Sequence, residues 1–215
     1  MRIRFDEQLD ALNKHLIMMG SLCEHLISTS LTALIEGDRD KAADAVLRVD
    51  EINGKERQIE DLCIKLLLQQ QPVARDLRTI TAALKMVTDM KRIADQAGDI
   101  SEIVRTGHTG PAADADAIKE MAEAAAKMVT RAIDAFVNRE ESLAFEVIRY
   151  DDVVDGLFDT VKNLLVEELS AGKVSGEYAI DLLMVAKYLE RIADHAENIA
   201  NWVLFSLKGG AENLV

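Results

Sequence analysis

Residues 84–104, LKMVTDMKRIADQAGDISEIV, and residues 183–203, LMVAKYLERIADHAENIANWV, decide the fold of this chain. The two segments align without gaps at an offset of 99 residues, and 8 of their 21 positions are identical, including an Arg-Ile-Ala-Asp run that begins at 92 and at 191. In both segments apolar residues recur every three or four positions, which is the spacing of one face of an α-helix. The repeat therefore predicts a duplicated helical unit.

Apolar positions continue at helical spacing on both sides of these segments, and each stripe ends at residues that favour turns. The breaks are Glu36-Gly37-Asp38, Gln71-Pro72, Gly107, Asn138-Arg139-Glu140 and Gly172. Each predicted helix has roughly 25–33 residues, or ~40–50 Å of length. We therefore expect an all-α fold of six long helices in two similar three-helix bundles, residues 1–106 and 115–215, with residues 107–114 (GHTGPAAD) as the linker.

Composition and charge exclude several classes of protein. The 215 residues are 49% hydrophobic and 29% charged, with a formal net charge of −13 and no cluster of lysine and arginine, so no nucleic-acid partner is expected. No apolar run approaches 18 residues, so no membrane span is predicted. The first residues lack an apolar signal region, and two cysteines are too few for a disulfide framework. These features predict a cytoplasmic protein.

Acidic residues one helical turn apart recur in the two aligned segments. Asp95 and Asp99 in the first correspond in spacing to Glu190 and Asp194 in the second. Residues four apart lie on one helix face and can share an ion, and oxygen ligands suit hard cations such as Mg²⁺, Mn²⁺ or iron. The same spacing is also typical of a solvated face with ordinary ion pairs, since an arginine precedes Asp95 and Asp194 by three residues. From the residues alone, both interpretations stay open.

The remaining reactive residues do not form a recognisable catalytic centre. No histidine has a glutamate three residues before it, so the Glu-x-x-His signature of ferritin-like di-iron bundles is absent. His195 is interpreted as a surface histidine, and His108 in the linker as a residue with no specific role. Cys23 and Cys63 fall at apolar helical positions and are predicted to be core thiols.

Three features together resemble the PhoU family of accessory regulators of phosphate-specific transport. They are the stretch from Gln70 to Arg78 (QQPVARDLR) followed by Leu84-Lys85, the repeated Arg-Ile-Ala-Asp, and the segment from Asp151 to Leu157 (DDVVDGL). The resemblance spans about residues 5 to 207. It implies a cytoplasmic, non-catalytic six-helix protein, often a homodimer. It also implies negative regulation of phosphate uptake and of the phosphate-starvation response, by linking the transporter's ATPase subunit to a sensor histidine kinase.

The resemblance also implies metal sites on the repeated acidic motif, with Mn, Fe, Mg or Zn as candidate ions. In the second half Glu190 and Asp194 occupy the motif. Asn198 follows one turn later, and Asp152 and Asp155 are the expected co-ligands on the neighbouring helix.

The first half departs from the family's pattern, because Lys91 replaces the motif glutamate and Asn53 stands in the place of Asp155. Asp95 and Asp99 remain as candidate ligands there. A lysine ammonium repels a cation and can take its place in a salt bridge. We therefore expect the second site to bind metal better than the first.

Two other functions compete with a regulatory adaptor. One is an enzyme whose carboxylate-bridged metals perform redox or hydrolytic chemistry, for which His195 is the sole candidate acid or base. The other is a plain helical scaffold that binds no metal.

Overall fold

A computed structural model describes residues 2–70, 73–109 and 115–208 of the chain. This part of the chain is helical apart from short connections. The helices are α1 (Arg2–Glu36), α2 (Arg39–Gln70), α3 (Ala74–Thr106), α4 (Ala115–Asn138), α5 (Glu141–Ser170) and α6 (Gly176–Lys208). The all-α expectation is confirmed. The predicted stop at Gln71-Pro72 and residues 110–114 of the predicted linker lie outside the described residues.

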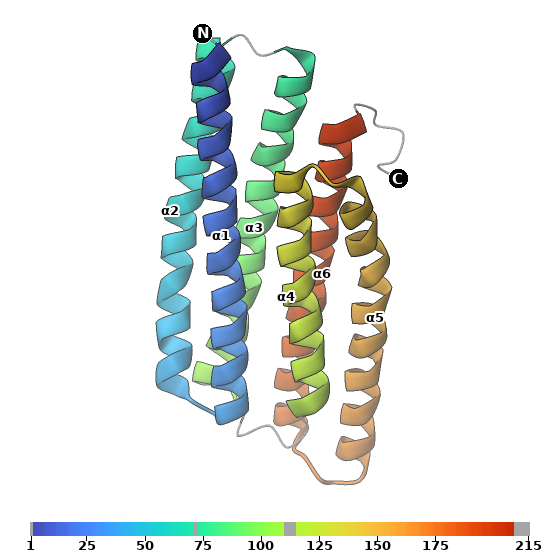
Figure 1. Cartoon of the computed structure of the whole chain (residues 1–215). Coiled ribbons are helices and arrows are strands. Elements are labelled where there is room, and N and C mark those ends of the chain that lie inside the picture. The colour runs from blue at the N-terminus through green and yellow to red at the C-terminus, as the bar shows by residue number, and fades with distance from the viewer. Residues whose placement is uncertain (1, 71–72, 110–114, 209–215) are drawn as a thin grey trace.

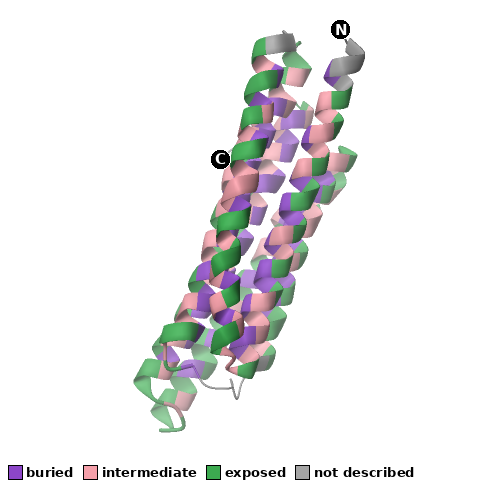
Figure 2. Cartoon of the chain, turned by 90° about the vertical axis from the view of Figure 1, so that its left-hand side faces the viewer, coloured by how far each residue is buried: buried purple, intermediate pink, exposed green. Residues whose placement is uncertain are grey.

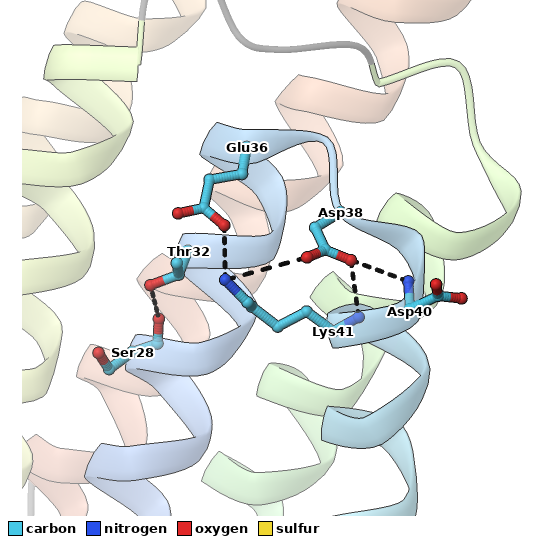
Figure 3. A network of polar contacts seen from close by, with 6 residues as sticks. All are labelled: Ser28, Thr32, Glu36, Asp38, Asp40 and Lys41. Carbon is cyan, nitrogen blue, oxygen red and sulfur yellow. Dashed lines mark hydrogen bonds and ion pairs between the residues drawn. The ribbon is translucent and has the colours of Figure 1, made fainter.

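The turns between helices lie where the sequence predicts breaks. Two helices end at glycines in the left-handed conformation, and a side-chain cap begins α2. Gly37 has a φ of 66° and Gly172 a φ of 68°, a region that glycine enters without steric cost. At the start of α2, Asp38 Oδ1 accepts hydrogen bonds from the backbone N–H groups of Asp40 (3.1 Å) and Lys41 (2.9 Å). Lys41 Nζ in turn reaches Glu36 at 2.5 Å, as Figure 3 shows, so one aspartate and one lysine close the turn between α1 and α2.

The two halves of the chain lie side by side along their length (Figure 1). Helix α3 packs against α6 and α1 packs against α4, while α2 and α5 lie at the outer edges of the molecule. One close approach of α1 and α4 depends on Gly20, where an added Cβ would clash with Ile133 Cδ1. The duplicated segments at 84–104 and 183–203 therefore form the central pair of helices.

One apolar core runs through both halves. Buried side chains come from every helix, including Leu16, Ile59, Met90, Met128 and Ile199. Figure 2 shows these buried faces directed inward and the exposed faces outward. At one end of the molecule, the end of α5 and the start of α6 extend beyond the turn between α1 and α2 (Figure 1). No helix among the described residues is long and apolar enough to cross a membrane.

Candidate functional site

The second acidic cluster lies between α5 and α6. It contains Asp151, Asp152 and Asp155 from α5 and Asp194 and Glu197 from α6. Burial, followed by repulsion from the neighbouring carboxylates, Glu197 first, raises the pKa of Asp151 from 3.8 to about 7. Burial followed by repulsion from Asp194 raises the pKa of Glu197 as well. Carboxylates from two neighbouring helices thus concentrate negative charge between α5 and α6.

Glu190 stands one turn before Asp194 and is paired with a lysine. Lys187 Nζ forms an ion pair with Glu190 on the same helix, and it also lies 5.5 Å from the centre of the Phe158 ring on α5. Burial and then the charge of Glu190 raise the pKa of Asp194, whereas Lys187 lowers it. Asn198, the remaining predicted ligand of this half, is exposed one turn further along α6. The second cluster therefore contains its own cation.

The first acidic cluster lies between α2 and α3. Lys91 forms an ion pair with Asp95, four residues later on α3. Burial raises the pKa of Glu56 on α2, followed by repulsion from Glu60, while Lys91 lowers it. The lysine that replaces the motif glutamate therefore takes a cation's place beside Asp95, as the sequence predicts.

The other two predicted ligands of the first half are Asp99 on α3 and Asn53 on α2. Burial, followed by the charge of Asp95, raises the pKa of the exposed Asp99, and Arg191 from α6 lowers it. Asn53 on α2 has a buried amide oxygen with no hydrogen-bond partner among the described residues. A buried amide oxygen without a donor can still accept a hydrogen bond.

Both clusters present oxygen atoms, which suit a hard cation, but these atoms are not arranged around a common point. All predicted ligands present oxygen atoms, which Mg²⁺ and Mn²⁺ prefer. Within residues 2–70, 73–109 and 115–208, however, no three histidine, cysteine, aspartate or glutamate side chains converge closely enough to hold a metal ion. The clusters are therefore negatively charged surfaces in this conformation, each with a lysine paired to one carboxylate.

His195 is not the surface residue that the sequence suggested. Its Nδ1 lies 3.0 Å from Asp89 Oδ1 on α3, and the two side chains are only 15% and 13% exposed. This hydrogen bond joins the two halves at the centre of the molecule. Asp89 accordingly faces α6 and takes no part in the cluster around Lys91. His195 points into the interface between α3 and α6, where its ring is hydrogen-bonded to the carboxylate of Asp89.

His108 also has a specific contact, contrary to the sequence interpretation. Its backbone N–H donates to Asp181 Oδ2 at 2.7 Å, and its Nδ1 lies 3.4 Å from the same oxygen. Asp181 belongs to α6, so this contact fixes the first residues after α3 to the second half of the chain. Cys23 and Cys63 are confirmed as buried free thiols, and burial raises the pKa of each to about 12.

The predicted ligands did not include five residues of the clusters: Asp151, Lys187, Glu197, Glu56 and Glu60. A signal for Lys187 existed, because a lysine three residues before Glu190 can form an ion pair on a helix. Glu56 and Glu60 lie on α2, and no pattern within α3 indicates which face of α2 meets it. Glu56 and Glu60 could be assigned to the cluster only after the structure showed how α2 packs against α3.

The fold and the paired acidic clusters define an all-helical protein of two related halves with no assembled catalytic centre in its described part. A sequence profile described as "PhoU domain" matches this chain twice, over residues 16–104 and 118–203. The two matches correspond to the two halves seen in the fold. The chain belongs to the PhoU family.

Comparison with individual proteins gives the same result. The chain is 31% identical over 210 residues to the phosphate-specific transport system accessory protein PhoU homolog of Pseudomonas aeruginosa, covering 96% of this chain and 86% of the relative. It is 33% identical over 209 residues to the PhoU homolog of Clostridium acetobutylicum, covering 95% and 94%.

Solved structures are similar over the same extent. The crystal structure of PhoU from Pseudomonas aeruginosa matches with a TM-score of 0.87 and 30% identity, over 96% of this chain and 100% of that one. The phosphate transport system regulatory protein PhoU from Streptococcus pneumoniae has the same fold, with a TM-score of 0.87 at 23% identity over 96% and 98%. This chain is a phosphate transport system accessory and regulatory protein, of a family that is not enzymatic.

Proposed function

We propose that this chain represses phosphate uptake and the phosphate-starvation response when phosphate is plentiful, by linking the ATPase subunit of the phosphate transporter to a sensor histidine kinase. The observation that carries the proposal is the double match to the PhoU domain across both halves of the chain. The relatives' description as accessory proteins of phosphate-specific transport supports it.

The charge distribution supports contacts with basic surfaces on those partners. The net charge is −13, and the outermost helices α2 and α5 each contribute carboxylates to an acidic cluster. Complementary charge speeds association and excludes wrong partners more than it adds affinity. A regulator that must bind and release two partners benefits from contacts of this kind.

A binding measurement with purified partners tests the proposal. The ATPase subunit and the cytoplasmic part of the sensor kinase are each immobilised, and the chain is passed over them at 50 and 300 mM salt. We expect binding to both, with association slowing as salt screens the acidic surface. Absence of binding to either partner at low salt would contradict the link between them.

We also propose that the chain is a cytoplasmic homodimer, as the family resemblance implies. Light scattering coupled to size-exclusion chromatography measures its mass directly. A mass near 48 kDa, twice the 23.8 kDa of one chain, is the expected result. A mass that stays at one chain's value as concentration rises would overturn the dimer.

A third part of the proposal is that the acidic clusters bind metal ions, Mn, Fe, Mg or Zn, with the second cluster stronger than the first. Glu190, Asp194, Asn198, Asp152 and Asp155 would supply the second set. Asp95, Asp99 and Asn53 would supply the first. Binding requires side chains to rotate toward one another and the second cluster's lysine to release its carboxylate. The metal would neutralise the facing carboxylates and draw α5 and α6 together.

Elemental analysis tests the metal proposal. The chain is purified without chelator as wild type, as Asp194→Ala and as Asp134→Ala, a control on an exposed α4 position outside both clusters. More than about half an equivalent of metal, lost in Asp194→Ala and kept in the control, is the expected result. Background metal in all three would instead indicate a helical adaptor whose carboxylates serve partners and salt bridges.

A further inference from the structure

A cavity of about 300 Å³ lies where the two halves of the chain meet at one end of the molecule. Its walls come from the start of α1, the start of α3, the end of α4 and the turn between α4 and α5. The polar side chains on them are Asn13, Arg75, Asp76, Thr79 and Arg139. The volume is at the lower end of the roughly 300–1,000 Å³ typical of small-molecule sites. None of these residues belongs to the acidic clusters.

Two arginines, one from each half, line this cavity. Arg75 lies in the first turn of α3, and Arg139 lies in the turn directly after α4, where its backbone N–H donates to Phe136 O at 3.2 Å. Neither guanidinium forms an ion pair with any residue in the described part of the chain. Burial lowers the pKa of Arg139, and the positive charge of Arg75 lowers it further, while Asp76 opposes the effect. The two cations therefore repel each other across the cavity.

Two arginines therefore share one cavity on a chain whose net charge is −13. Arg48, Arg105 and Arg131, in contrast, each pair with a carboxylate. At the cavity two guanidiniums face a single carboxylate, that of Asp76, and this leaves an excess positive charge. A second anion in the cavity would relieve the repulsion and neutralise the excess.

The chemistry of the lining selects the kind of anion. A guanidinium presents several N–H donors in a plane and binds phosphoryl and other tetrahedral oxyanions through paired hydrogen bonds. The amide of Asn13 adds a neutral donor. The first N–H groups of α3 have no partner within the helix, and Val73 at its N-cap supplies no side-chain cap, so the potential at this end of α3 is also positive. The cavity is large enough for a phosphoryl group with part of its hydration shell.

We propose that this cavity binds a phosphoryl group, held between Arg75 of the first half and Arg139 of the second. The bound oxyanion joins α3 to the turn after α4 and so couples the two halves at this end. The site goes beyond the proposed partners and metal ions, because it rests on the cavity and its two arginines alone. Free phosphate and the phosphate of a nucleotide share the necessary chemistry.

Calorimetric titration of the purified chain with inorganic phosphate, and separately with adenosine monophosphate, tests the site. Wild type should bind at least one of the two with a Kd of about 1 mM or tighter. Arg75→Gln and Arg139→Gln should each weaken that binding at least tenfold. Asp76→Asn should tighten it, since it removes the one carboxylate that competes for the arginines. Arg149→Gln, an exposed arginine of α5 outside the cavity, is the matched control and should leave binding unchanged.

Each outcome of the two titrations either supports the phosphoryl site or overturns it. Binding of inorganic phosphate identifies the free ion as the source, and binding of the nucleotide alone identifies an organic phosphate. Absence of saturable binding of both probes overturns the site, as does binding that Arg139→Gln leaves intact. Circular dichroism on each variant shows that it is folded, and the tightening expected for Asp76→Asn cannot arise from a loss of structure. Failure here would leave partner binding untouched, so the two proposals fail separately.

Discussion

The raised pKa of Asp151 predicts a stability effect with a definite sign. Because the pKa is about 7 in the folded chain and 3.8 in the reference state, the folded state holds this proton at pH values where the unfolded state has lost it. Stability therefore falls as pH rises from about 4 to about 7. Asp151→Asn removes the charge while keeping the shape of the side chain. We expect this variant to be more stable than wild type above pH 7.

The magnitude follows from the shift and from the exposure of the group. A difference of about 3 pKa units corresponds to about 4 kcal/mol at most, at 1.36 kcal/mol per unit. Asp151 is only partly buried and faces solvent-accessible carboxylates, so screening reduces the expected gain to about 1–2 kcal/mol. The gain should be smaller at pH 5 and should vanish only below about pH 4, where the unfolded state holds the proton as well.

Urea unfolding at pH 5 and pH 8, in the presence of chelator, measures the stability gain of Asp151→Asn at each pH. Asp134→Asn on α4 serves as the control, because this exposed aspartate belongs to neither cluster; we expect it to change stability by less than about 0.5 kcal/mol at either pH. An Asp151→Asn variant that is no more stable than wild type at pH 8 would refute the reasoning. So would a gain of equal size at both pH values, since repulsion between ionised carboxylates would then not be its cause.

Three further changes have expected outcomes. Gly107→Ala places a Cβ 2.7 Å from Asp181 Oδ2 and 2.5 Å from a backbone oxygen, so urea unfolding should show a loss of about 1–3 kcal/mol, whereas Gly156→Ala in open space on α5 should gain about 0.5–1 kcal/mol. Asp89→Ala removes the hydrogen bond between the halves and should cost about 1–3 kcal/mol in the same assay. Lys91→Glu replaces the paired ammonium with a carboxylate and should strengthen Mn²⁺ binding at the first cluster about tenfold in calorimetric titration.

Each of these expectations has a clear contrary result. Equal stability of the two glycine variants would show that the contact at the end of α3 has no energetic weight. Cooperative unfolding of Asp89→Ala at the wild-type midpoint would show that the central hydrogen bond contributes nothing. Unchanged Mn²⁺ binding after the lysine substitution would remove the charge argument for a weak first cluster.

Local sequence determined the ends of the helices well. Gly37 and Gly172 were predicted stops, and both adopt a left-handed conformation that few other residues enter without strain. Arg139, at the predicted break after α4, has a φ of 57° and performs the same role without being glycine. Helix ends depend on interactions within a few residues, and such interactions are readable from a single sequence.

Contacts between helices were the part that sequence could not supply. His195 follows Asp194 on α6, and nothing within that helix indicates that an aspartate of α3 faces it. Glu56 and Glu60 likewise become part of a cluster only because α2 packs beside α3. Lys91 was predictable, because its effect on Asp95 acts within one helix at a spacing of four residues. Periodicity identifies a buried face but not the residue on the opposite helix.

The most direct test of the regulatory role is the activity of a phosphate-starvation promoter in living cells. A bacterium whose own PhoU protein has been deleted receives this chain together with its matching ATPase subunit and sensor kinase, and the promoter is measured in phosphate-rich medium. The account predicts that the promoter falls to the repressed level when the chain is present and rises when it is withdrawn. A promoter that stays active despite stable expression of the folded chain would contradict the proposed repression.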